Sequence, residues 1–420
     1  MTPKSFRRET CRLCNSRQLT EVLALTPTPP ANAFVAADAR SMTQETFPLD
    51  VFFCEDCAHV QLLDVVDPEL LFGNYVYVSG TSPVFVKHFD EYAERIIDEF
   101  VPEPTGRLVI DIGSNDGTLL AQFQNRGMTV LGIDPARDIA AQASAKGIET
   151  LPTFFSATLA AEIKTSHGRA QVITANNVFA HADNLADITD GIASLLAPDG
   201  VFVFEVSYLV DVFEDTLFDT IYHEHLAYHS VKPLVGFLAA HGLELIDAAR
   251  VASHGGSLRG IAQRAGGPHP VAASVQVLIS REAEIGLHQA ATLQQFGAKI
   301  NAIKDELKDV LTRLKDAGHT IAGFGAPAKA TTLMYHFGIG PEMIDFIVDD
   351  SPLKQGLYSP GMHIPVLTSD ALYSEKPDAV VVLAWNFAQP IMQNHARYLD
   401  QGGQFIVPLP HVETVMASGR

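Results

Sequence analysis

Four cysteines have the spacing of metal ligands. They form two Cys-x-x-Cys pairs, Cys11 with Cys14 and Cys54 with Cys57, and the chain has no other cysteine. In a reducing compartment each pair can present two thiolates to one tetrahedral ion, so the sequence predicts a Cys₄ zinc site rather than two disulfides. Four thiolates leave no position for water, so we expect the metal to be structural. Ordinary buried cysteines are the alternative.

A second group of reactive side chains lies near the middle of the chain, where three histidines, two tyrosines and a glutamate fall within eight positions. Acid–base catalysis needs a histidine with a pKa near neutrality, a carboxylate that orients it and a hydroxyl donor. His225, Glu224 and Tyr222 supply those types. A metal site at His225 with His229, or at His223 with His225, is one alternative. A loop that packs its own polar groups is another.

A glycine-rich turn follows a predicted buried strand at 108–112. Asp111, Gly113 and Gly117 form the pattern Asp-x-Gly-x-x-x-Gly, and Asp134 ends the next predicted strand, 23 positions after Asp111. A carboxylate at that place in a βαβ unit can take both hydroxyls of a ribose. The dinucleotide fingerprint Gly-x-Gly-x-x-Gly is absent, and Asp111 favours a cationic ligand over a pyrophosphate. A strand–turn–helix without a ligand is the alternative.

This turn and its two acids resemble the first motifs of class I S-adenosylmethionine methyltransferases. The resemblance implies that Asp134 holds the ribose and that Asp111 lies near the amino-acid end of the cofactor. The other expected cofactor contacts lie in the same turn or after a later strand, and they are Ser114, Asn115, Asn176 and Asn177.

Three further segments carry candidate contacts to a substrate. His254, Ser257 and Arg259 lie in a glycine-containing loop that combines a hydroxyl with a cation. Lys329 follows a second glycine turn, where a lysine and helix N–H groups can bind phosphate, although the spacing of a P-loop is absent. Tyr77 lies in a stretch rich in tyrosine and glycine that could close over a site. Ordinary turns and an aromatic linker are the alternatives.

The elements that must position these residues alternate between strand and helix. Apolar periodicity predicts a helix at 83–100 and a long helical stretch at 275–314. The alternation predicts two open, largely parallel sheets that bind ligands at the carboxyl ends of their strands. The first sheet is expected to contain strands at 108–112, 129–133, 148–155, 171–175, 201–206, 243–251 and 258–264. The second is expected to contain a strand before the second glycine turn and strands at 344–348, 379–384 and 404–409.

The expected fold class is therefore α/β in three parts. A small zinc-binding module at 1–70 precedes a central class I methyltransferase Rossmann-like domain at 71–270. A C-terminal Rossmann-like α/β domain at 271–420 is expected to bind the substrate nucleotide.

The charge balance and hydropathy exclude some partners. The chain has 29 basic and 49 acidic residues, a net charge of −20, which argues against a nucleic-acid partner. No run of 18 apolar residues and no apolar signal core is present, so we expect a cytoplasmic protein with no membrane partner. The oligomeric state stays open, and a monomer is compatible with the sequence.

Together the motifs resemble the sugar C-methyltransferases of deoxysugar pathways over nearly the whole chain. The resemblance rests on the cysteine pairs, the acidic glycine turn and the segments 176–181, 222–225, 254–259 and 323–329. It implies methyl transfer from S-adenosylmethionine to C3 of a nucleotide-linked 4-keto-6-deoxysugar, with zinc in the N-terminal module. The expected nucleotide is dTDP, although no residue specifies the base.

The resemblance also assigns roles to individual side chains. It implies that His225 and Tyr222 perform acid–base catalysis and that Glu224 orients the histidine. Tyr77 is a further catalytic candidate, and His223 is a substrate contact. Two other functions stay open: a small-molecule O-methyltransferase in which the same base deprotonates a hydroxyl, and a non-catalytic nucleotide-sugar-binding scaffold.

Overall fold

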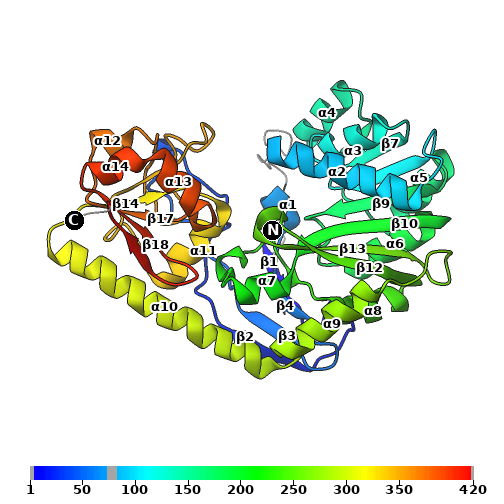
Figure 1. The fold of residues 1–420 in the computed structure, drawn as a ribbon, viewed down its shortest axis with the longest axis horizontal. Helices are drawn as coiled ribbons and strands as arrows, with labels where there is room; N and C mark the ends of the chain where they lie inside the picture. The colour runs from blue at the N-terminus through cyan, green and yellow to red at the C-terminus, as the bar shows by residue number, and fades with distance from the viewer. Residues whose placement is uncertain (1–3, 73–82, 418–420) are drawn as a thin grey trace.

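The computed structural model describes residues 4–72 and 83–417. Two α/β parts lie side by side, and strands from the N-terminal segment run between and below them (Figure 1). The long helix α10 (Ala290–Asp316) passes along the lower side of the molecule and packs against β2 (Leu19–Leu23). The N-terminal segment is thus in contact with the helix that leads into the C-terminal part.

The central part is built on a seven-stranded sheet with the order β12-β13-β10-β9-β6-β7-β8. Five strands are parallel, and β12 and β13 close one edge as antiparallel strands. The strands are β6 (Leu108–Ile112), β7 (Thr129–Ile133), β8 (Thr150–Leu151), β9 (Ala170–Asn176), β10 (Leu196–Ser207), β12 (Leu243–Val251) and β13 (Ser257–Arg264). All five side chains of β6 are buried, as expected for a parallel strand covered on both faces.

Most predicted strands of this sheet are confirmed, but the third predicted strand is too long. The sequence predicts a strand at 148–155, whereas β8 contains two residues. Pro152 follows them and has no N–H to continue the ladder, so the edge strand ends there. The helices of this part are α2 (Pro83–Phe100), α3 (Thr118–Gln124), α4 (Arg137–Ala145), α5 (Ala157–Ser166), α6 (Leu185–Leu195), α7 (Leu209–Glu214) and α8 (Val231–Ala240).

A four-stranded sheet of order β11-β4-β3-β2 forms the N-terminal module. Three of its strands come from the first 62 residues, but β11 (Ala227–Tyr228) comes from the segment that the sequence assigns to the central domain. The other strands of this sheet are β2, β3 (Val51–Cys54) and β4 (Val60–Leu62), and β11 pairs with β4. Separately, β1 (Ser5–Arg7) pairs with β5 (Asp64–Val66), ahead of the short helix α1 (Pro68–Phe72).

The long helical stretch predicted at 275–314 is two helices. α9 (Ala273–Ile285) ends at Gly286, whose φ of +85° is the left-handed conformation that terminates helices, and α10 begins at Ala290. The break lets the chain turn from the central part toward the C-terminal part.

The C-terminal part contains a six-stranded sheet with the order β16-β15-β14-β17-β18-β19. Its first five strands are parallel, and their order is the doubly wound one, in which ligands bind beside the first strand, β14. The strands are β14 (Ile321–Phe324), β15 (Phe346–Val348), β16 (Val366–Leu367), β17 (Ala379–Val382), β18 (Gln404–Val407) and the antiparallel β19 (Glu413–Val415). The helices are α11 (Ala328–Phe337), α12 (Ala371–Ser374), α13 (Ala388–Asn394) and α14 (Ala396–Asp400).

Membrane-crossing helices are absent from the part of the chain that the structure describes, because no helix there is both long enough and apolar enough.

Candidate functional site

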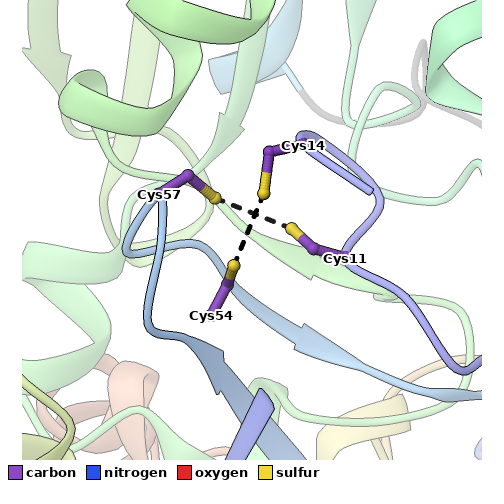
Figure 2. Close-up of side chains that lie close together, drawn as sticks. All are labelled: Cys11, Cys14, Cys54 and Cys57. Atoms are coloured by element: carbon purple, nitrogen blue, oxygen red, sulfur yellow. Dashed lines mark hydrogen bonds between the residues drawn. The ribbon is translucent and has the colours of Figure 1, made fainter. Parts of the chain in front are cut away.

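The four cysteines converge on one point. Their sulfur atoms all lie within 4.8 Å of one another, and the Cys11–Cys57 and Cys14–Cys54 pairs are 3.6 and 3.5 Å apart (Figure 2). The two lines joining these pairs cross in the picture, as expected for the opposite edges of a tetrahedron. The sulfurs thus fit one zinc ion, and the prediction of a Cys₄ site is confirmed.

Local backbone geometry shapes both cysteine knuckles in the same way. The residues that follow the two pairs, Asn15 and Ala58, have positive φ values of 59° and 66°. Their N–H groups donate to the carbonyl oxygens of Cys11 and Cys54. Contact between the two thiols lowers the pKa of Cys11 and raises that of Cys57, so Cys11 is the sulfur of this pair that ionises first.

The two predicted acids of the cofactor turn lie at the carboxyl edge of the central sheet. Asp111 is 4% exposed and accepts a hydrogen bond from the Thr174 hydroxyl at 2.6 Å, and its burial raises its pKa to about 7. Asp134 accepts from the backbone N–H groups of Asn115 and Ala136, both at 2.8 Å. The backbone of the turn is therefore folded around Asp134.

The turn fits a polar ligand that approaches closely. Gly113 has a φ of +73°, and a Cβ there would lie 2.2 Å from the Val178 side chain, so this position of the turn requires glycine. The Ser114 hydroxyl and the side-chain amide of Asn176 are buried and have no hydrogen-bond partner among residues 4–72 and 83–417. Because buried polar groups normally have partners, these groups and Asp111 suit the amino-acid and nucleoside groups of adenosylmethionine.

The predicted acid–base pair is brought together. The rings of Tyr222 and His225 lie 4.1 Å apart, and His181 stacks on His225 at 4.9 Å. Nδ1 of His225 lies 2.7 Å from the carbonyl oxygen of Thr220. A carbonyl only accepts, so Nδ1 carries a proton, and this bond helps to fix the orientation of the imidazole.

Glu224 and His223 lie against the N-terminal module. Glu224 accepts a hydrogen bond of 2.9 Å from Asn32, and its burial raises its pKa to about 7. His223 is 1% exposed, and its Nε2 lies 3.1 Å from the carbonyl oxygen of Phe47. The expectation that Glu224 orients His225 is corrected, since the Thr220 carbonyl occupies Nδ1 of that histidine.

The alternative metal site at the histidines lacks support. Among residues 4–72 and 83–417, three or more ligating side chains come close enough to bind a metal at the four cysteines and not at these histidines. His229 is fully buried and packs against His59 and Phe179, away from a shared site with His225.

Two predicted substrate contacts lie in a buried polar network. The Arg259 guanidinium donates to Glu205 at 2.7 Å and lies 4.3 Å above the ring of Tyr92. The Ser257 hydroxyl donates to the carbonyl of Ser253 at 3.0 Å. His254 belongs to the short 3₁₀ helix Ser253–Gly255, and Tyr77 lies outside the described residues.

Sequence reasoning missed His88, Glu205 and His181 as site residues. His88 lies on α2, with Nε2 2.9 Å from the Glu205 carboxylate. Glu205 interrupts the apolar run at 201–206 near the carboxyl end of β10, and this was a detectable signal. His181 closes the segment 176–181, but its stacking on His225 depends on the tertiary fold.

Lys329 contacts the segment before the acid–base pair. Its Nζ lies 3.8 Å from Oδ2 of Asp219 and 4.5 Å above the ring of Trp385. Burial lowers the pKa of Lys329, and the Asp219 charge opposes that shift. The lysine therefore lies between the central and C-terminal parts.

Comparison with known proteins covers almost all of the chain. Residues 11–72 match the family model of a zinc binding domain, residues 85–248 that of a methyltransferase domain, and residues 252–410 that of the C-methyltransferase C-terminal domain. The C-methyltransferase NovU of Streptomyces niveus is 34% identical over 407 residues, which are 97% of each chain.

More distant similarities are confined to part of the chain. The ubiquinone biosynthesis O-methyltransferase of Colwellia psychrerythraea is 25% identical over 34% of this chain and 63% of its own. Magnesium protoporphyrin IX methyltransferase of Synechocystis, solved with bound SAH, is 18% identical with a TM-score of 0.33, covering 43% of this chain and 83% of that one.

Proposed function

Because the chain belongs to the C-methyltransferase family that includes NovU, we propose that it methylates C3 of a nucleotide-linked 4-keto-6-deoxysugar. It is an S-adenosylmethionine-dependent methyltransferase with an N-terminal zinc module. The observation that carries the proposed reaction is the contact between Tyr222 and His225, with Nδ1 of His225 occupied by the Thr220 carbonyl.

The two rings supply the groups that a C-methylation needs. Carbon becomes nucleophilic only when a proton leaves beside the ketone, and the imidazole of His225, which Thr220 holds through Nδ1, is the group that would accept that proton. The electron pair moves to the C4 oxygen, where the Tyr222 hydroxyl can donate a hydrogen bond to the enolate. When bound, the cofactor would supply an electrophilic methyl group to C3 and leave as adenosylhomocysteine.

The cofactor would be held at the acidic turn. We assign the ribose hydroxyls to Asp134 and the ammonium group to Asp111, whose burial makes an adjacent cation favourable. The segment from Asn176 to His181 leads from this edge to the His225 ring, so the cofactor edge and the base are linked by six residues.

The nucleotide diphosphate would lie between the central and C-terminal parts, near Lys329. Its ammonium lies 3.8 Å from Asp219 and 4.5 Å above the Trp385 ring, and its three N–H donors suit a phosphate oxygen.

Hydrogen exchange at C3 tests this function against O-methylation. In deuterated water with adenosylhomocysteine bound, the wild-type enzyme should exchange the C3 hydrogen of a nucleotide 4-keto-6-deoxysugar. His225→Gln and Tyr222→Phe should slow that exchange about 100-fold, the usual contribution of one acid–base group. After addition of adenosylmethionine, NMR should show a new methyl singlet on a quaternary C3. A methoxy signal without exchange would establish the O-methyltransferase, and an absence of any product across a panel of such sugars would favour the scaffold.

A further inference from the structure

The segment that precedes the acid–base pair is held by the C-terminal part of the molecule. Asp219 lies in the 3₁₀ turn Phe218–Thr220 and is fully buried. Its Oδ2 accepts a hydrogen bond of 2.7 Å from the indole N–H of Trp385, and Lys329 lies 3.8 Å away. Oδ1 of Asp219 has no hydrogen-bond partner among residues 4–72 and 83–417, so the Trp385 indole and the Lys329 ammonium are the polar side chains that face this carboxylate there.

A second contact holds the other side of the same turn. The Thr332 hydroxyl on α11 donates to the carbonyl oxygen of Ile221 at 2.8 Å, and both groups are buried. Thr220 therefore lies between two residues that are attached to the C-terminal part. Its carbonyl oxygen is the acceptor for Nδ1 of His225.

The N-terminal module supports a different stretch of this segment. Its contacts begin at His223 and Glu224 and continue through β11, which pairs with β4. None of these contacts acts on Thr220. The C-terminal part thus contacts both residues that flank Thr220, whereas the zinc module contacts the stretch that follows Tyr222.

We propose that Asp219 is a positioning residue through which Trp385 and Lys329 of the C-terminal part hold the Thr220 carbonyl against His225. Without the indole bond, the buried carboxylate is left with a long contact to Lys329, and the turn can relax. The Thr220 carbonyl then shifts, and the His225 imidazole loses its single Nδ1–H tautomer. The proposal rests on the proposed function in one respect, the assignment of His225 as the base.

The imidazole tautomer gives a test that does not depend on the substrate. In protein labelled with ¹⁵N-histidine, the two ring nitrogens of His225 can be assigned by comparison with His225→Gln. Wild-type enzyme should show one Nδ1–H tautomer. Trp385→Phe, which keeps a ring but removes the donor, and Thr332→Val, which removes the second bond at nearly constant shape, should each give mixed tautomers.

The variants that change the His225 tautomer should also slow C3 exchange, but they should not weaken cofactor binding. Because misplacement by about 1 Å can cost about 100-fold in rate, C3 exchange should fall 10- to 100-fold in Trp385→Phe and Asp219→Ala. The dissociation constant for adenosylhomocysteine should stay within about twofold, since the acidic turn is unchanged. Asp219→Asn keeps an oxygen for the indole N–H and should restore the wild-type tautomer.

A matched control separates positioning from general loosening of the C-terminal part. Tyr373→Phe removes a hydroxyl that lies 3.0 Å from Nδ1 of His395 within that part, and it should leave the His225 tautomer unchanged. If Trp385→Phe fails to fold, as judged by circular dichroism, Thr332→Val decides the result alone.

The outcomes distinguish this proposal from the proposed function. An unchanged His225 tautomer in Trp385→Phe, Thr332→Val and Asp219→Ala would overturn the positioning role, even if the wild-type enzyme exchanges C3 hydrogens. If the variants change the His225 tautomer but the wild-type enzyme exchanges no C3 hydrogen, the positioning role would be supported and the proposed C-methylation would be overturned.

Discussion

Glu224 of the central part and Asn32 of the N-terminal module share a hydrogen bond of 2.9 Å, although 192 positions separate them in the chain. Together with the β11–β4 pairing, this bond attaches the segment that carries Tyr222 and His225 to the zinc module. The structural metal therefore has a route by which it can affect catalysis without touching a substrate.

The first prediction concerns the metal. Purified protein should contain about one zinc per chain, and Cys54→Ser with Cys57→Ser should abolish it, because two thiolates do not complete a tetrahedral site. Elemental analysis measures the metal, and C3 exchange should fall with it. Full zinc content in the double variant would show that other residues bind the ion.

The second prediction concerns the Asn32–Glu224 bond. Asn32→Ala should raise the pKa of Glu224 above its present value of about 7, because this bond favours the ionised carboxylate against burial. Unfolding by urea should show a loss of about 1–3 kcal/mol from the unpaired buried carboxyl. Thr20→Val is the control, since it removes an exposed bond of the same module to Glu55. A pKa of Glu224 that does not move, as followed by carboxyl NMR, would contradict this account.

The third prediction concerns the ribose contact. Asp134→Ala should weaken adenosylhomocysteine binding about 10- to 100-fold, or about 1.5–3 kcal/mol, because charge-assisted hydrogen bonds are lost. Calorimetry measures the change, and Asp138→Ala provides an exposed acid of the following helix as the control. If wild type and Asp134→Ala bind adenosylhomocysteine equally tightly, Asp134 does not hold the ribose.

The fourth prediction concerns pH. Burial raises the folded-state pKa of Asp111 from 3.8 to about 7, so between these values the folded protein without ligand binds more protons than the unfolded chain. Its stability contribution is present below about pH 4 and is lost as the pH rises toward 7. Asp111→Asn should therefore raise Tm more at pH 8 than at pH 4.

The same carboxyl should make cofactor binding depend on pH with the opposite sign. An ammonium group favours the ionised form, so adenosylhomocysteine should bind more tightly as the pH rises through 7, by at most about tenfold per pH unit. In Asp111→Asn this dependence should disappear. Equal pH profiles of binding in the two proteins would place the ammonium elsewhere.

The fifth prediction concerns the joint between α8 and α9. Glu282 is fully buried, and its carboxylate accepts from the N–H groups of Val231 and Lys232 at the start of α8 and from the Tyr208 hydroxyl. Glu282→Gln should cost about 1.5–3 kcal/mol of unfolding free energy without changing cofactor affinity. The exposed Glu284→Gln should cost nearly nothing in the same urea titration.

The amino-acid sequence by itself determined the local features of this protein. Strand β6, the glycine turn after it, strand β7 and the cysteine knuckles depend on residues close together in the chain, so periodicity and spacing predict them. The break at Gly286 and the short β8 were missed because apolar runs continue past the residues that end these elements.

The partners of the site residues were decided only by the tertiary structure. Glu224 is next to His225 in the chain, yet it bonds to Asn32, while the Thr220 carbonyl orients the histidine. Lys329 pairs with Asp219 across 110 positions. Neighbouring side chains on an irregular segment point in different directions, and which distant group each one meets depends on how the three parts pack together.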